Sequence, residues 1–195
     1  MKPQKRKQIL DIAEKLFNRF GIKRTGVDEI AQLSNVAKGT IYNYFGSKDG
    51  IFKELMNDKL QMFEDFLGKT IVSINDPVGK LRIALLSHLK IVIENPFLSD
   101  KMLYGNYDEK IRLFLEKLDE SSRKIISRII QNNYTKKLLP KEQQAIVNTL
   151  LFTLKGMKET IRGQLESISI KKFEQDIEYL INALLPQKIS NQNGS

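Results

Sequence analysis

Apolar residues recur three and four positions apart along nearly the whole chain, and alternating apolar and polar stretches are scarce. This spacing lines up apolar side chains on one face of an α-helix, whereas a strand needs an alternation of period two. The first such face consists of Ile9, Ala13, Leu16, Phe17 and Phe20. Gly21 follows it as the left-handed stop expected just past a helix end. The pattern therefore predicts an all-α fold.

Start and stop signals divide the chain into predicted helices. Asp76-Pro77 is typical of a helix start, with aspartate as the N-cap and proline at the first helical position. Thr25 opens a short helix in a variant of the capping box, and Ser47 can cap another. The predicted helices cover about residues 5–20, 25–33, 37–45, 48–74, 77–95, 97–104, 108–134, 140–163 and 171–185.

The order of these helices suggests three parts. Residues 1–47 hold three short helices, residues 48–186 form a larger helical domain, and residues 187–195 are a polar tail that we expect to be disordered. The long helix over residues 48–74 would join the first two parts.

Composition excludes several kinds of site. The chain has no cysteine, which rules out disulfides, cysteine-rich zinc sites and thiol nucleophiles and favours a reducing compartment. Charges interrupt every apolar run before the roughly 18 residues of a membrane span, and no signal-peptide pattern opens the chain. We therefore expect a cytoplasmic protein that does not cross a membrane.

An enzyme is not favoured. The chain has one histidine and no serine in a nucleophile-elbow context. Gly21 and Gly26 have the spacing of a phosphate-binding loop, but Val27-Asp28 follows where Lys-Ser/Thr is needed. We predict no catalytic residue, no cofactor and no metal site.

The positive charge is concentrated near the N-terminus. The net charge is +9, and residues 1–50 hold ten Lys/Arg against five Asp/Glu. A basic region favours an acidic partner such as nucleic acid. Lysine-rich solvated helices are also common, so the charge alone does not decide the partner.

A helix, a four-residue turn and a second helix span residues 25–45, and this arrangement lays the second helix in the DNA major groove. Asn35 lies in the turn, and asparagine is the commonest residue other than glycine in the left-handed conformation that such a turn needs. Ile41 and Phe45, four apart, would pack inward, and Gly39 would let the backbone approach DNA. The outward set is Lys38, Gly39, Thr40, Tyr42, Asn43 and Tyr44.

These outward residues have groups suited to DNA. Lys38 would contact a base edge or a phosphate, Thr40 a phosphate or a thymine methyl, and Asn43 an adenine. The tyrosine hydroxyls would contact phosphate oxygens. Thr25 and Lys48, at helix starts, would bring backbone amides to phosphates, and Lys48 its charge as well.

The segments 25–31, 37–45 and 47–49 resemble the DNA-binding domain of the TetR family of bacterial repressors, over about residues 5–55. The resemblance implies a helical homodimer with a ligand cavity in its C-terminal body and DNA release when the cavity fills. The chain departs from the family pattern at three positions. Asn35 replaces a common glycine, Ala37 gives no side-chain cap, and Gly50 stands where a capping-box glutamate is frequent.

Two helix-turn-helix units reach adjacent faces of DNA only when a dimer holds them about 34–36 Å apart. We expect the last two helices to form this dimer contact. Gly156 and Gly163 would allow close helix approach there. The candidates are Leu150, Leu154, Gly156, Met157, Ile161, Ile177, Leu180, Ile181 and Leu184. The alternative is that these residues complete the core of one subunit.

The middle helices hold aromatic and polar residues that could line a ligand cavity. The candidates are Phe63, Phe66, His88, Met102, Tyr104, Tyr107 and Phe114, with Phe97 nearby. The alternative is that most are core residues. The expected effector is a small apolar molecule, such as a lipid-like acyl compound or a hydrophobic drug.

The function predicted from the sequence is a ligand-responsive regulator, more often a repressor, that binds double-stranded operator DNA as a dimer. Corepression and activation stay open. The alternative class is a basic helical adaptor or membrane-surface protein, which would bind anionic vesicles without preferring any DNA sequence.

Overall fold

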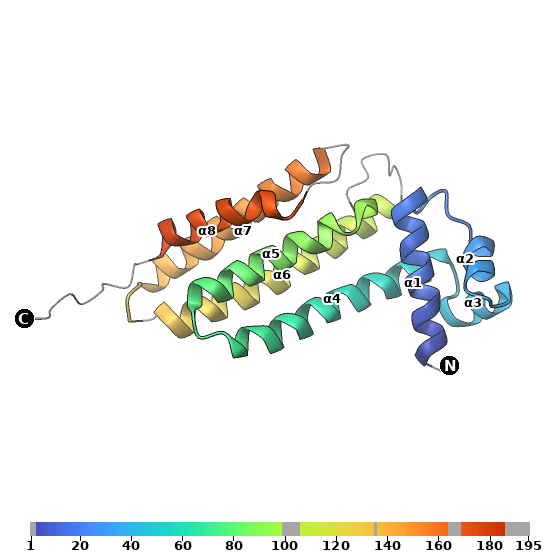
Figure 1. Ribbon diagram of the computed structural model, residues 1–195, viewed down its shortest axis with the longest axis horizontal. Coiled ribbons are helices and arrows are strands. Elements are labelled where there is room, and N and C mark those ends of the chain that lie inside the picture. Colours follow the sequence, from blue (N-terminus) through green and yellow to red (C-terminus); the bar gives the residue numbers. More distant parts are fainter. Residues whose placement is uncertain (1–2, 99–105, 135, 164–168, 186–195) are drawn as a thin grey trace, which may run out of the picture. The chain divides into compact units, whose positions relative to one another are not determined.

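The computed structural model describes residues 3–98, 106–134, 136–163 and 169–185, and all regular structure within these ranges is helical. This confirms the all-α prediction (Figure 1). Among the described helices, none is both long and apolar enough to cross a membrane. The helices are α1 Pro3–Phe20, α2 Val27–Leu33, α3 Lys38–Phe45, α4 Lys48–Ser73, α5 Pro77–Ile93, α6 Asn106–Tyr134, α7 Pro140–Gly163 and α8 Lys171–Leu184, with a 3-10 turn at Pro96–Leu98.

The chain forms two compact units, and α4 and α6 contribute to both. The first unit comprises residues 1–66 and 94–118, and the second comprises residues 67–93 and 119–195. The predicted sequence domains, 1–47 and 48–186, are a different division and stay a prediction. The predicted tail, 187–195, lies outside the described residues.

Three aromatic rings form the core of the first unit. Phe17, Phe52 and Phe97 are almost fully buried, and their centroids lie 6.0 to 6.5 Å apart. The ring planes are tilted or edge-on, the arrangement that aromatic pairs prefer. Since the rings come from α1, α4 and the 3-10 turn, this cluster holds three separate segments together.

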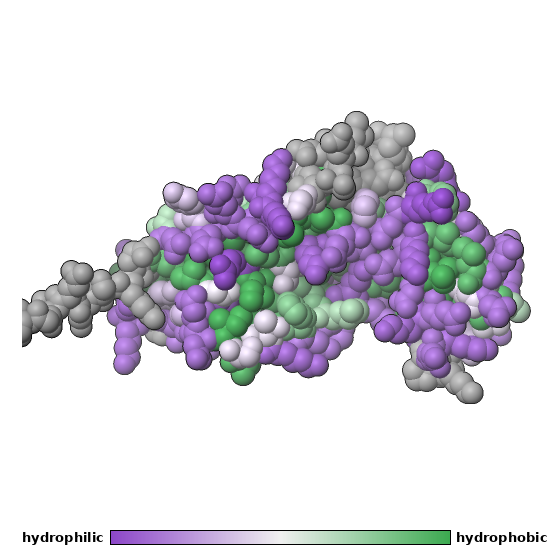
Figure 2. Space-filling view, in the orientation of Figure 1, coloured by the Kyte–Doolittle hydropathy of each residue, from purple (hydrophilic) through white to green (hydrophobic). Residues whose placement is uncertain are grey.

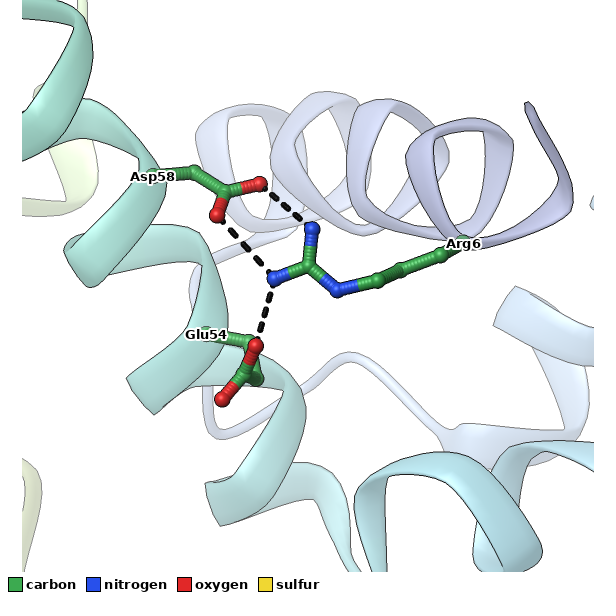
Figure 3. A network of polar contacts seen from close by, with 3 residues as sticks. All are labelled: Arg6, Glu54 and Asp58. Atoms are coloured by element: carbon green, nitrogen blue, oxygen red, sulfur yellow. Dashed lines mark hydrogen bonds and ion pairs between the residues drawn. The ribbon is translucent and has the colours of Figure 1, made fainter. Parts of the chain in front are cut away.

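Ion pairs add a second link between α1 and α4. The guanidinium of Arg6 donates to both carboxylate oxygens of Asp58, at 2.9 and 3.0 Å, and also to Glu54 (Figure 3). These hydrogen bonds raise the pKa of Arg6 above its ordinary value. Lys59, the residue after Asp58, pairs with Glu14 of α1 at 2.7 Å. The basic start of α1 is thereby fixed against the long helix.

The second unit is a bundle of helices. In it α5 packs against α7 and α8, and α7 packs against α8. Buried aliphatic residues fill the interior, among them Leu81, Leu85 and Leu89 of α5. The carboxylate of Asp76 accepts hydrogen bonds from the amides of Val78 and Gly79, which confirms Asp76 as the N-cap of α5.

The predicted helix bounds agree closely with those observed, with two exceptions. Helix α2 begins at Val27, its N-cap is Gly26, and no side chain caps it, so the predicted capping role of Thr25 was wrong. Of the short helix predicted at 97–104, the described part is a single 3-10 turn, and residues 99–105 lie outside the described residues.

Candidate nucleic-acid interface

The turn between α2 and α3 is closed by backbone hydrogen bonds. The amide of Asn35 donates to Gln32 O at 3.1 Å, and that of Val36 donates to Ala31 O at 3.0 Å. Asn35 has φ 51°, the left-handed conformation predicted for it. The turn therefore fixes the direction in which α3 leaves α2.

Helix α3 has one buried side and one exposed side, as its sequence predicted. Ile41 and Phe45 are buried in the first unit. Tyr42 and Tyr44 are 44% and 46% exposed, large values for aromatic residues. Thr40 is half-buried. The remaining outward positions, Lys38, Gly39 and Asn43, are exposed.

Lys38 contacts the neighbouring helix through its ammonium. Its Nζ lies 2.8 Å from a carboxylate oxygen of Asp28 on α2, and this hydrogen bond raises the pKa of Lys38. Both side chains are largely exposed, so the pair is weak and a phosphate can compete for the ammonium. The pair orients Lys38 across the outer side of the helix-turn-helix.

Lys48 occupies a structural position that the sequence did not reveal. Its Nζ donates to three backbone carbonyls of the α1–α2 loop: Ile22 at 2.8 Å, Thr25 at 2.9 Å and Lys23 at 3.3 Å. Burial lowers the pKa of Lys48. The ammonium that we expected to contact a phosphate is thus engaged by the protein, and it anchors the loop to the start of α4.

The side chain of Thr25 closes the same loop from within. It is 1% exposed, and its Oγ1 donates to Gly21 O at 2.9 Å. The hydroxyl is therefore used within the protein, whereas the approach of the Thr25 backbone amide to a phosphate stays a prediction. The sequence signal for this hydrogen bond is the spacing of four residues between Thr25 and Gly21, which ends α1. The same threonine also fits the pattern of a helix N-cap, so the sequence alone does not distinguish the two roles.

The first turn of α4 lies directly against the end of α3. A Cβ built on Gly50 would stand 1.7 Å from Phe45 O, a separation that no side chain can adopt. The capping glutamate common in the family therefore cannot fit at Gly50 in this backbone. Ser47 instead caps the turn by accepting from the amide of Gly50 at 3.0 Å.

The predicted ligand residues have different environments. Phe63 and Phe114 are buried in the first unit, whereas Phe66 is half-exposed there. His88 is buried in the second unit. Met102 and Tyr104 lie outside the described residues, and the side chain of Tyr107 is not described.

The predicted dimer residues lie mostly inside the second unit. Met157, Leu180 and Leu184 are half-buried, and Gly156 is exposed with open space around it. Gly163 is the last residue of α7, and its burial is not described. Five of the candidates have 8% exposure or less and belong to the core of the chain itself: Leu150, Leu154, Ile161, Ile177 and Ile181. For these five, the alternative of a monomer core is correct.

Two rings outside the predicted dimer residues are exposed instead. Phe152 of α7 is 73% exposed, and Tyr179 of α8 is 75% exposed. Each ring lies between the apolar positions, three and four residues apart, that defined the predicted dimer face of its helix. Apolar areas also interrupt the hydrophilic surface drawn in Figure 2.

Within the described part of the chain, no group of three or more histidine, aspartate or glutamate side chains is placed to hold a metal ion.

Comparisons with known proteins agree with this geometry. Residues 9–55 match the family model described as bacterial regulatory proteins of the tetR family. The uncharacterized HTH-type transcriptional regulator YhgD of Bacillus subtilis is 43% identical over 61 residues, which are 31% of this chain and 32% of that protein. YuxN of the same organism, described in the same words, is 28% identical over 163 residues, 80% of this chain and 53% of that protein.

A solved structure extends the likeness to the whole fold. The regulator FadR of Bacillus subtilis, in complex with stearoyl-CoA, has a TM-score of 0.71 over 92% of this chain and 99% of that one, at 17% identity. At this identity the likeness shows the fold alone. The matched regions of this chain span about a third of the length of YhgD and about half of the length of YuxN. Residues 9–55 therefore match the DNA-binding region of the tetR family of bacterial regulatory proteins, and the described helices share their fold with a solved regulator.

Proposed function

We propose that this chain is a ligand-responsive transcriptional regulator that binds a near-palindromic operator as a homodimer and acts as a repressor. The exposed side of α3 carries the proposal. It presents two tyrosines, an asparagine and a lysine on a helix that a closed turn and a buried face hold in place.

The proposed DNA contacts follow from this surface. Tyr42, Tyr44 and Asn43 supply hydroxyl and amide groups, and Lys38 supplies a charge that a weak ion pair releases readily. Thr40 reaches DNA with its exposed part. Gly39 has no neighbour within 4 Å of a built Cβ, so its small size serves approach to DNA rather than packing within the protein. Lys48 acts indirectly, by holding the loop.

The proposed dimer contact uses the outer sides of α7 and α8. Phe152, Tyr179 and Gly156 are exposed there, and a hollow of about 450 Å³ lies along α8 beside Tyr179. Large aromatic rings are among the residues that contribute most to protein interfaces. A two-fold contact of this kind would fix the spacing between the two copies of α3.

The effector is proposed to bind in the helical body. Support comes from the family match over residues 9–55 and from the fold shared with a regulator whose structure contains stearoyl-CoA. The body is built from amphipathic helices with an apolar interior, which suits an apolar molecule.

The test is a selection of genomic DNA fragments by the purified protein, followed by footprinting and by binding measurements from low to high salt. We expect protection of a short, nearly palindromic site, with an affinity that falls steeply as salt rises. Binding to anionic vesicles, with no preferred DNA sequence, would instead support the membrane-surface alternative and reject the regulator.

A further inference from the structure

Four polar side chains meet in the second unit, three of them in its largely apolar interior and one at the rim. They come from three helices: His88 from α5, Asp119 and Ser122 from α6, and Lys158 from α7. His88, Ser122 and Lys158 are each at most 5% exposed. Polar groups in a helical core are costly unless they are paired, so such a cluster needs an explanation.

Two of these groups converge on one oxygen. Lys158 Nζ donates to Asp119 Oδ1, and His88 Nε2 lies 3.4 Å from the same atom. On its other side, His88 Nδ1 lies 2.7 Å from Ser122 Oγ. The serine hydroxyl can donate to Nδ1, and the ring then carries its N–H on Nε2. The 3.4 Å approach of Nε2 to Asp119 Oδ1 is a close contact rather than a hydrogen bond, so Lys158 is the donor bound to this oxygen and His88 is a second donor within reach of it.

The histidine takes part as a neutral ring. Burial, with a smaller contribution from the charge of Lys158, lowers the pKa of His88 to about 3. Near neutral pH the cluster therefore contains one positive charge and one negative charge. Of the two groups that face Asp119 Oδ1, Lys158 is charged and His88 is neutral.

The two charged partners differ in how easily they can leave. The side chain of Lys158 is 6% exposed, whereas that of Asp119 is 41% exposed. A buried ammonium needs a counter-ion, but a carboxylate at the rim can be hydrated instead. Lys158 is therefore the fixed member of the pair, and the carboxylate is the member that can be exchanged.

We propose that His88 and Lys158 form a binding site for the carboxylate of a small organic acid, which replaces Asp119 at the two donors. The proposal rests on the effector response proposed above, and it assigns the effector a chemical class. Buried aliphatic residues lie one turn from each donor: Leu85 and Val92 beside His88, and Leu154 and Ile161 beside Lys158. The rest of the acid is therefore apolar, as in a medium-chain fatty acid.

The test compares decanoate with decanol, which has the same chain length but no charge, both below the concentration at which decanoate forms micelles. Isothermal titration calorimetry measures binding to the protein of residues 1–195 without DNA. Three variants are compared with the wild type: Lys158→Met, Asp119→Asn, and Lys155→Met as the control. Lys155 is exposed on the same helix, so its loss changes net charge equally without touching the cluster.

We expect the wild type and Lys155→Met to bind decanoate and to discriminate against decanol. Lys158→Met should lose decanoate affinity by about tenfold or more, because a charged hydrogen-bond donor is removed. Asp119→Asn should bind decanoate about tenfold more tightly, because the internal competitor is gone. A merely structural Asp119 would give no such gain.

Equal binding of decanoate and decanol, or an Asp119→Asn protein that gains no decanoate affinity, would overturn the proposal. Should Lys158→Met fail to fold, the aspartate variant and the two probes still decide. Operator binding, measured separately by fluorescence anisotropy, distinguishes failure of this inference from failure of the proposed function. A protein that binds its operator but ignores decanoate contradicts only this inference, whereas a protein without an operator contradicts the proposed function.

Discussion

Lys110 of α6 forms an ion pair with Asp49 of α4, the residue that directly follows Lys48. Lys48 in turn holds the α1–α2 loop through three carbonyls, and Gly50 packs on the carbonyl of Phe45 at the end of α3. The start of α4 therefore connects three parts of the first unit: α6, the α1–α2 loop and α3. Contacts at residues 48–50 decide how these parts are held.

The Lys110–Asp49 pair should contribute modestly to stability. Both side chains are about a third exposed or more, and exposed pairs contribute about 0.2 to 1 kcal/mol. We expect a double-mutant cycle with Lys110→Met and Asp49→Asn, measured by urea unfolding, to give a coupling free energy in that range that shrinks at high salt. Lys117→Met, an exposed lysine on the same helix, is the control. A coupling that is zero at low salt would contradict the pairing.

Lys38 and Lys48 should behave differently when each is replaced by methionine. Lys38→Met removes a charge proposed to neutralise a phosphate, so the plot of log affinity against log salt should flatten by about 0.9. Lys48→Met removes hydrogen bonds to three carbonyls, so the free energy of unfolding should fall by about 1 to 3 kcal/mol while the salt slope stays unchanged. A flattened slope for Lys48→Met would restore the phosphate contact expected from the sequence.

Tyr42→Ala should weaken operator binding without changing the fold, because the side chain is half-exposed and covers no core. The expected loss is about tenfold, the effect of one well-placed polar contact. Circular dichroism and the melting temperature should match those of the wild type. Unchanged operator affinity in this variant would remove Tyr42 from the interface.

Gly50→Ala and Gly68→Ala form a matched pair on α4. At Gly50 the new Cβ would lie 1.7 Å from Phe45 O, so the end of α3 must move. We expect the free energy of unfolding to fall by about 3 kcal/mol or more, and operator binding to be lost. At Gly68 nothing lies within 4 Å, so alanine should stabilise the helix by about 1 kcal/mol. Urea unfolding measures both. A tolerated alanine at position 50 would show that the close approach is not required.

The sole histidine should give the protein a characteristic pH dependence. The pKa of His88 falls from 6.5 to about 3 on folding, so between these values the unfolded chain binds a proton that the folded chain does not. Stability from this group is therefore complete above pH 6.5 and is lost as the pH falls, by up to about 1.4 kcal/mol per unit. His88→Gln should flatten the fall between about pH 6.5 and 4.5 in urea unfolding. An equally steep fall in the variant would place His88 in a solvated environment.

The sequence by itself determined most of the helices, their approximate ends and the polar side of α3. Each depends on residues close together in the chain: the spacing of Ile41 and Phe45, the left-handed tolerance of Asn35, and the capping of α5 by Asp76. Local backbone geometry and local periodicity suffice for such features. This is why the helix-turn-helix can be recognised from the order of its residues alone.

Only the tertiary structure decided which side of each later helix is core and where the charged groups go. Periodicity shows that α7 has an apolar face, but not whether Leu150 and Leu154 meet their own chain or a partner. Lys48 reaches carbonyls more than twenty residues away, and Lys158 meets Asp119 across 39 residues. Such pairings depend on how helices pack, a long-range property that no local pattern in a single sequence encodes.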